Sequence, residues 1–167
     1  MAENLVITGT TKEERYQSLL PQVRALIEDE TDLTAALANL SAALTSAFKW
    51  WWTGFYIVKE SQLVLGPFQG PIACTRIAYG RGVCGTAWKE NRTLTVPDVE
   101  EFPGHIACSS LSKSEIVVPL HNSKGTVVGV LDVDSESLSC FDETDAKYLE
   151  EIARLLTRFF DQGGSTA

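Results

Sequence analysis

The spacing of the apolar residues changes twice along this chain of 167 residues, and that change constrains the fold more than any other feature. Near both ends, apolar residues recur every three to four positions, which is the spacing of one helix face. Between these regions, short segments rich in aromatic and β-branched residues are separated by Gly and Pro, as antiparallel strands are. The sequence therefore predicts an α+β fold with a central, mostly antiparallel sheet and N- and C-terminal helices packed on it.

Capping residues mark the start of each expected helix. Thr11, with Glu14 three residues later, forms a capping-box pattern that begins the first helix. Pro21 lies inside this helix and predicts a kink or a break there. Asp32 is expected to cap the second helix and Asp142 the last one.

The middle of the chain is divided into short elements by turn residues. Strands are expected over 50–58, 62–68, 72–77, 115–120 and 126–134, and a short helix over 82–90. There is no internal repeat and no linker rich in Pro, Gly or Ser. We therefore expect a single domain over residues 1–167, with a frayed tail from about residue 163.

The charge of the chain argues against several classes of partner. The 22 acidic and 14 basic residues give a net charge of -8 at pH 7, and a surface of that sign repels phosphate. We therefore expect no nucleic acid and no membrane as partners. No apolar run approaches the roughly 20 residues of a membrane span, and the first residues lack the features of a signal peptide. A cytoplasmic location follows, where the four cysteines are core thiols, metal ligands or redox-active groups.

The segment Gly80–Gly85 matches the G-x-G-x-x-G pattern of dinucleotide sites. The helix after it is short, however, and the neighbouring strands are joined by turns rather than by crossover helices. We interpret these glycines as a tight turn and a close-packed helix start.

The cysteines are too widely spaced for a structural zinc site, and His105 and His121 do not form a ligand pair, so no metal is expected. Cys140, beside a helix entrance, is interpreted as a buried small hydrophobe. Cys84 lies at a helix start, where the helix dipole lowers a thiol pKa. Cys108 follows His105 by three residues. These patterns leave both Cys84 and Cys108 open as a nucleophile.

Three acidic residues are expected to converge at one end of the sheet. Asp132 and Asp134 are two apart on a strand and share one face. If the hairpin pairs Leu120 with Val127, Glu115 lies opposite Asp132. Repulsion between the three carboxylates would then raise at least one pKa and retain a proton. Such a cluster can hold a ligand ammonium and donate a proton to an oxygen, although a solvated strand end or a cation site explains the pattern equally well.

An aromatic strand provides a candidate apolar wall. Trp52, Gly54 and Tyr56 share one strand face, and the glycine leaves a gap between two rings that a small apolar group can fill. The alternative is an ordinary aromatic core strand.

Seven segments, in chain order, resemble the free methionine-(R)-sulfoxide reductases, which are enzymes built on a GAF domain. They are WTGFY at 52–56, LGPFQG at 65–70, ACTRI at 73–77, GRGVCGTA at 80–87, GHIAC at 104–108, SEIV at 114–117 and GVLDVDS at 129–135. GAF domains mostly serve as ligand sensors, so the pattern of three cysteines is more specific than the fold.

The resemblance implies a redox role for three cysteines. Cys108 would attack the sulfur of free methionine (R)-sulfoxide, Cys74 would resolve the sulfenic acid as a disulfide, and Cys84 would be an auxiliary thiol. Thioredoxin would be the external reductant, and no cofactor is implied. Cys140 has no part in this pattern.

The resemblance also implies the substrate contacts. Glu115, Asp132 and Asp134 would bind the polar groups of the amino acid, and Trp52 and Tyr56 would enclose its S-methyl group. The family often forms homodimers, and the apolar first helix fits a homodimer and intramolecular packing equally well. Two alternatives are a GAF module that senses a small ligand, with non-catalytic cysteines, and a thiol-ligated metal domain.

Overall fold

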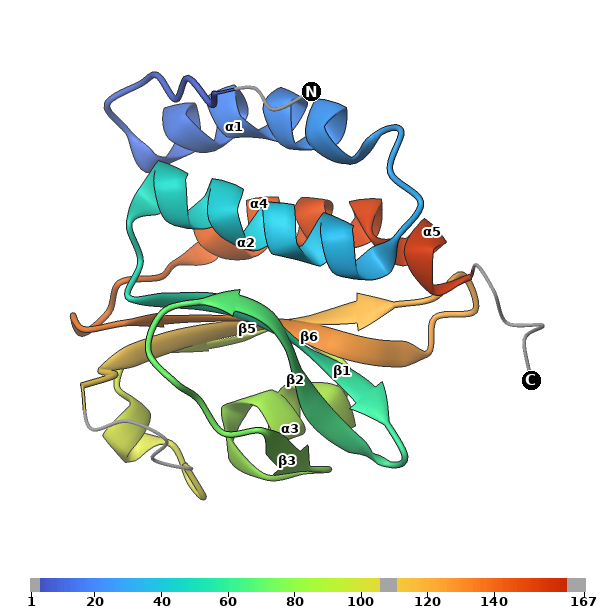
Figure 1. Ribbon diagram of the computed structural model, residues 1–167. Helices are drawn as coiled ribbons and strands as arrows, with labels where there is room; N and C mark the ends of the chain where they lie inside the picture. Colours follow the sequence, from blue (N-terminus) through green and yellow to red (C-terminus); the bar gives the residue numbers. More distant parts are fainter. Residues whose placement is uncertain (1–3, 106–110, 162–167) are drawn as a thin grey trace.

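The computed structural model describes residues 4–105 and 111–161, and its centre is a single antiparallel sheet (Figure 1). The six strands lie in the order β3-β2-β1-β6-β5-β4, and each neighbouring pair is antiparallel. Their bounds are β1 Trp52–Lys59, β2 Gln62–Gln69, β3 Arg76–Ala78, β4 Leu94–Val96, β5 Ser114–His121 and β6 Val127–Ser135.

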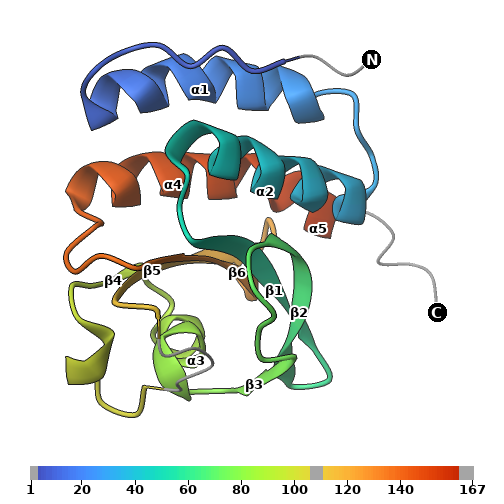
Figure 2. The same ribbon diagram turned by 60° about the vertical axis from the view of Figure 1, so that its left-hand side comes forward.

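Helices cover both faces of the sheet, in unequal number (Figures 1 and 2). Helix α2 packs on β1 and β2, helix α4 packs on β5, and α1 forms an outer layer on α2 and α4. Helix α3 lies on the opposite face, against β3, β5 and β6. The helices are α1 Lys12–Ile27, α2 Leu33–Phe48, α3 Gly82–Glu90, α4 Glu143–Leu155 and α5 Thr157–Phe160, with a 3-10 helix, η1, over Val99–Glu101. The predicted α+β architecture is confirmed.

The alternation of side chains along β1 divides the buried apolar residues into two cores. Phe55 faces the helices and packs in the larger core with residues of α1, α2 and α4. Trp52 and Tyr56 face the other way, toward α3, and belong to a second, smaller core. The second core lies beside the acidic residues of β5 and β6, so it is the one that positions the candidate site.

The predicted helix caps are observed. The side chain of Thr11 accepts a hydrogen bond from the backbone N–H of Glu14, and Glu14 completes the capping box. Asp32 caps α2, and Asp142 caps α4 with Asp145 as the reciprocal partner. These ends depend on contacts between residues two or three apart, which the sequence displays directly.

Asp145 also ties α1 to α4. Its carboxylate is fully buried, and it accepts hydrogen bonds from Lys12 Nζ at 2.6 Å and from the Tyr16 hydroxyl at 2.6 Å. Both donors come from the first turns of α1. A charged side chain without access to water needs such partners, so this contact fixes how α1 lies on the α2–α4 layer.

Pro21 does not break the first helix, contrary to that part of the prediction. Helix α1 runs from Lys12 to Ile27 with Pro21 inside it. The missing N–H of proline removes one helical hydrogen bond. The buried residues on either side of it, Leu19, Leu20 and Val23, pack in the larger core and hold the helix in place.

The third strand is shorter than the sequence indicates. A strand was expected over 72–77, whereas β3 begins only at Arg76. The carbonyl of Pro71 accepts a hydrogen bond from Trp52 Nε1 at 3.0 Å, and the carbonyl of Cys74 accepts one from the Tyr56 hydroxyl at 2.8 Å. Aromatic side chains therefore bind the backbone of this segment, and it crosses the smaller core as a loop. The three-residue strand β4 was not predicted, because it is too short to show an alternating pattern.

No helix within the described residues combines the length and the apolar composition that crossing a membrane requires.

Candidate active site

A cavity lies between the sheet and α3, and most of the predicted site residues line it. Its free volume is about 70 Å³. Predicted site residues in its wall are Trp52, Tyr56, Cys84, Glu115, Asp132 and Asp134. The strands β1, β5 and β6 and the first turn of α3 thus bring together residues that are far apart in the sequence.

The three acidic residues converge, although in a different register from the predicted one. Glu115 lies opposite Asp134 rather than Asp132, and Leu120 pairs with Gly129 rather than Val127. The pairing is shifted by two residues relative to the predicted hairpin: His121 rather than Leu120 pairs with Val127, and an irregularity between Leu120 and His121 adds one more residue. A two-residue shift leaves the same side chains on the same face, so the carboxylates still point into the cavity.

Burial and mutual repulsion determine the charge of this acidic cluster, Glu115, Asp132 and Asp134. Burial, together with the charges of Asp132 and Asp134, raises the pKa of Glu115 well above its ordinary value. Burial and the charge of Asp132 likewise raise the pKa of Asp134, although Ser112 donates a hydrogen bond to it at 3.2 Å.

Burial also raises the pKa of Asp132, but by less than for the other two acids. Hydrogen bonds from Glu115, Asp134 and Cys84 and the nearby His105 act in the opposite direction. Asp132 is therefore the member of the cluster that is most readily ionised, while Glu115 and Asp134 retain protons.

No lysine or arginine among the described residues neutralises the negative charge of the acidic cluster. In residues 4–105 and 111–161, no Lys or Arg forms an ion pair with Glu115, Asp132 or Asp134. Among the described residues, one buried oxygen of Asp132, Oδ1, finds no hydrogen-bond partner. A buried carboxylate oxygen without a partner is costly, so the site is suited to a ligand that brings a hydrogen-bond donor or a positive charge.

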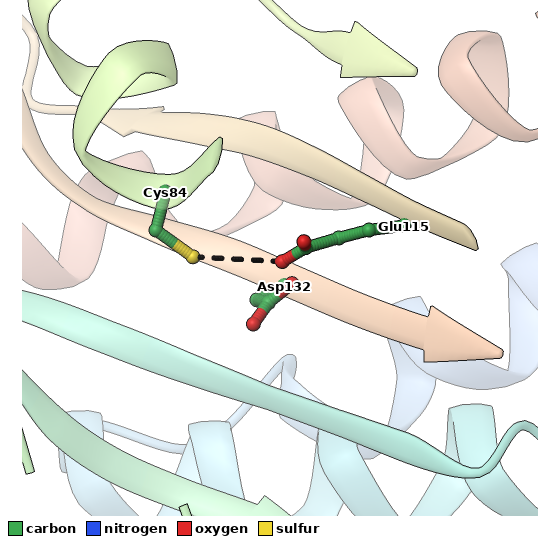
Figure 3. A group of neighbouring side chains, drawn as sticks. All are labelled: Cys84, Glu115 and Asp132. Carbon is green, nitrogen blue, oxygen red and sulfur yellow. Dashed lines mark hydrogen bonds between the residues drawn. The ribbon is translucent and has the colours of Figure 1, made fainter. Parts of the chain in front are cut away.

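Cys84 enters the cavity from the first turn of α3 (Figure 3). It is a free cysteine, it is buried, and its Sγ lies 3.9 Å from Oε2 of Glu115. The expectation that the helix start lowers its pKa is wrong. Burial raises the pKa of Cys84 well above its ordinary value, and the charges of Asp132, Glu115 and Asp134 raise it further. Cys84 is therefore held as a thiol, which is a poor nucleophile.

The aromatic wall is present, and it also holds the backbone that carries Cys74. The rings of Trp52 and Tyr56 are stacked with their centroids 6.0 Å apart. Trp52 and Tyr56 donate the hydrogen bonds to the carbonyls of Pro71 and Cys74 described above. Burial raises the pKa of Tyr56, so its hydroxyl remains a neutral donor. Cys74 itself is half-buried and disulfide-bonded.

The gap predicted above Gly54 is not open. A Cβ atom at this position would collide with Cβ of Phe68 on the neighbouring strand and would lie 2.8 Å from Cη2 of Trp52. The ring of Phe68 stacks on Trp52 with centroids 5.1 Å apart. The glycine therefore serves close packing of β1 on β2, and the free space lies in front of Trp52 and Tyr56 instead.

The glycines of the G-x-G-x-x-G segment have the structural role that was expected. Gly80 and Gly82 adopt positive φ values of 76° and 63°, which favour glycine. A Cβ atom on Gly85 would lie 2.5 Å from the carbonyl oxygen of Ala78, so glycine lets α3 approach this segment closely.

Two further predictions concern Cys140 and Cys108. Cys140 is a free cysteine that packs against the larger core, as predicted for a small hydrophobe, although it is half-buried rather than buried. Cys108, the predicted nucleophile, lies outside the described residues. The frayed tail predicted from about residue 163 also lies outside them.

Sequence reasoning missed several residues of the cavity wall. Ser112, Arg81 and Ile72 line it, and His105, noted only for its position before Cys108, does so as well. These residues lie in loops or just outside regular elements. Their position depends on how the loops cross the sheet, and no local pattern in the sequence signals it.

Comparison with known proteins shows which family this chain belongs to. A GAF domain model matches residues 29–161. The structure of a free methionine-R-sulfoxide reductase from Neisseria meningitidis in complex with its substrate is 54% identical, covers 95% of each chain and superimposes with a TM-score of 0.92. The free methionine-R-sulfoxide reductase of Escherichia coli is 45% identical over 148 residues, which are 88% of this chain and 89% of that protein. This chain belongs to the free methionine-R-sulfoxide reductase family of GAF domain proteins.

Membership in the free methionine-R-sulfoxide reductases confirms the resemblance and the predicted enzyme class, an oxidoreductase. A further relative, GAF domain-containing protein A of Dictyostelium discoideum, is 61% identical over 157 residues, which are 93% of this chain and 99% of that protein. Similarity over nearly the full length of these proteins includes both the helices and the cavity-forming strands.

Proposed function

We propose that this protein reduces free L-methionine (R)-sulfoxide to L-methionine in the cavity between the sheet and α3. The observation that carries the proposal is the convergence on one cavity of a buried acidic cluster, an aromatic wall and the loop of Cys74. The family assignment supports the reaction class, and the relative from Neisseria meningitidis has been solved with its own substrate.

The acidic cluster accounts for binding of a free amino acid. The ionised carboxylate of Asp132, with its unpartnered Oδ1, matches the ammonium of the substrate. The sulfur and methyl group then lie against Trp52 and Tyr56. A methionine sulfoxide inside a peptide has no such ammonium, so the site favours the free amino acid.

The same cluster supplies a proton donor. A sulfoxide sulfur becomes electrophilic when its oxygen is hydrogen-bonded or protonated. Glu115 and Asp134 retain protons because they are buried beside other carboxylates. One of them donates a hydrogen bond to the sulfoxide oxygen.

The redox steps follow from the chemistry of the thiols. The Cys108 thiolate attacks the sulfoxide sulfur, methionine leaves, and the oxygen remains on Cys108 as a sulfenic acid. The Cys74 thiol displaces that oxygen as water and forms a disulfide with Cys108, with Cys84 as an auxiliary thiol. Two electrons have then passed from the two thiols to the substrate.

An external dithiol must return these electrons, and we infer that it is thioredoxin in a cytoplasmic setting. Cys74 is disulfide-bonded, half-buried and supported at its carbonyl by Tyr56, which suits an exchange reaction near the surface. The single domain over residues 1–167 and the homodimer remain predictions.

Replacement of single cysteines tests the assignment of roles. Cys108→Ser is expected to abolish turnover, and Cys74→Ser is expected to release about one methionine per chain in a single turnover and then stop. Cys140→Ser, outside the cavity, is the matched control and is expected to keep steady-state activity. Steady activity in Cys108→Ser would refute the proposed roles.

A further inference from the structure

Three potential metal ligands meet in the cavity from three different elements. Cys84 comes from α3, Glu115 from β5 and Asp132 from β6, and Figure 3 shows their side chains directed toward one another. The Sγ atom and one oxygen from each carboxylate all lie within 4.8 Å of one another. All three residues are buried, with exposed fractions of 4%, 6% and 6% respectively.

In the described part of the chain, the two carboxylates of this group lack the lysine or arginine partner that a buried acidic group usually has. Within residues 4–105 and 111–161, Asp132 Oδ1 is buried with no hydrogen-bond partner, and no Lys or Arg pairs with either carboxylate. The site therefore holds an unsatisfied acceptor oxygen, and the ionised carboxylate of Asp132 carries a charge that no Lys or Arg of these residues neutralises. A small cation satisfies both, because a buried carboxylate is stabilised by pairing or by metal coordination.

The donor atoms indicate which cation. Mg²⁺ and Ca²⁺ prefer an all-oxygen environment, whereas a thiolate sulfur selects a softer ion. Zn²⁺ accepts sulfur and carboxylate oxygen together and binds with four ligands, one of which is often water. We propose that Cys84, Glu115 and Asp132 form a binding site for Zn²⁺ that overlaps the substrate cavity. On binding, the Cys84 thiol and the Glu115 carboxyl group each lose a proton to solvent, and they coordinate the metal as a thiolate and a carboxylate.

Occupation of this site has a functional consequence. The metal would use the same Asp132 carboxylate that the proposed function assigns to the substrate ammonium. Zn²⁺ and free methionine sulfoxide would therefore exclude each other, and Zn²⁺ would act as a competitive inhibitor that requires Cys84. This is a role for the buried thiol separate from disulfide exchange.

Direct titration of the full-length chain with zinc chloride tests the site. The disulfide form is used, so that Cys74 is not available to the metal, and binding is followed by competition with a chromophoric chelator. We expect about one Zn²⁺ per chain. Cys84→Ser and Asp132→Asn should each weaken binding at least about tenfold, while Cys140→Ser, which removes the other free cysteine of the described chain, leaves it unchanged. The proposal would be overturned if the unmodified chain bound no Zn²⁺. It would also be overturned if Cys84→Ser and Asp132→Asn both bound Zn²⁺ as tightly as the unmodified chain does.

The same titration separates this proposal from the proposed function. Zinc binding to the disulfide form requires no reductase activity, so it can succeed or fail independently of turnover. Adding free methionine sulfoxide should weaken zinc binding if both occupy the cavity. Intact zinc binding that free methionine sulfoxide does not weaken would support the metal site and contradict the placement of the ammonium at Asp132.

Discussion

Replacing Tyr56 with phenylalanine removes one hydroxyl from the cavity wall and leaves the ring in place. That hydroxyl donates a hydrogen bond of 2.8 Å to the carbonyl of Cys74. The hydrogen bond is partly buried and joins two neutral groups, so its net contribution is about 0.5–1.5 kcal/mol. Because it holds the backbone of the proposed resolving cysteine, its loss should slow disulfide formation by about two- to twelvefold. The attack on the substrate should proceed at its normal rate.

A single-turnover experiment separates the two steps. The reduced protein is mixed with free methionine (R)-sulfoxide, and released methionine and remaining sulfenic acid are measured over time. We expect unchanged methionine release and a longer-lived sulfenic acid in Tyr56→Phe. The matched control is Tyr79→Phe, at an exposed tyrosine that contacts Trp88 outside the cavity wall. Slower methionine release with normal decay of the sulfenic acid would show that the hydroxyl acts on the substrate, and the reasoning would be wrong.

Three further predictions concern stability. Burial raises the pKa of Glu115 above its ordinary 4.5, so the ligand-free protein should lose stability as the pH rises above that ordinary value. Glu115→Gln should flatten this pH dependence in urea titrations, and an unchanged slope would contradict the account. Asp145→Ala leaves the buried hydroxyl of Tyr16 without its acceptor, while Lys12 keeps its contact with Asp142. The free energy of unfolding should fall by about 1–3 kcal/mol, and an unchanged value would argue against the role given to this contact. Gly85→Ala places a methyl group against the Ala78 carbonyl and should lower the free energy of unfolding by about 1–3 kcal/mol, which is measured as a lower urea midpoint. An unchanged midpoint would mean that α3 is not closely packed there.

The parts of the fold that the sequence predicts well are those determined by neighbouring residues. The capping residues Thr11, Asp32 and Asp142 were predicted correctly, because each contacts a backbone group two or three positions away. The convergence of Glu115 and Asp134 was also predictable, because strand alternation fixes which face a side chain takes.

The errors come from contacts between distant parts of the chain. The hairpin register depends on an irregularity after Leu120 that no sequence pattern signals. The start of β3 depends on hydrogen bonds from Trp52 and Tyr56, about twenty residues earlier. The pKa of Cys84 was predicted from its helix alone, whereas burial and carboxylates from β5 and β6 determine it. A local argument cannot include such neighbours.

The most direct test of the central claim compares substrates in a thioredoxin-coupled assay. The purified chain is given free L-methionine (R)-sulfoxide, the S epimer and an N-acetylated (R)-sulfoxide that lacks the ammonium. We expect rapid consumption of the reductant with the free R epimer and little with the other two. Equal turnover of all three, or none with the free R epimer, would contradict the account of a cavity that binds a free amino acid through its acidic cluster.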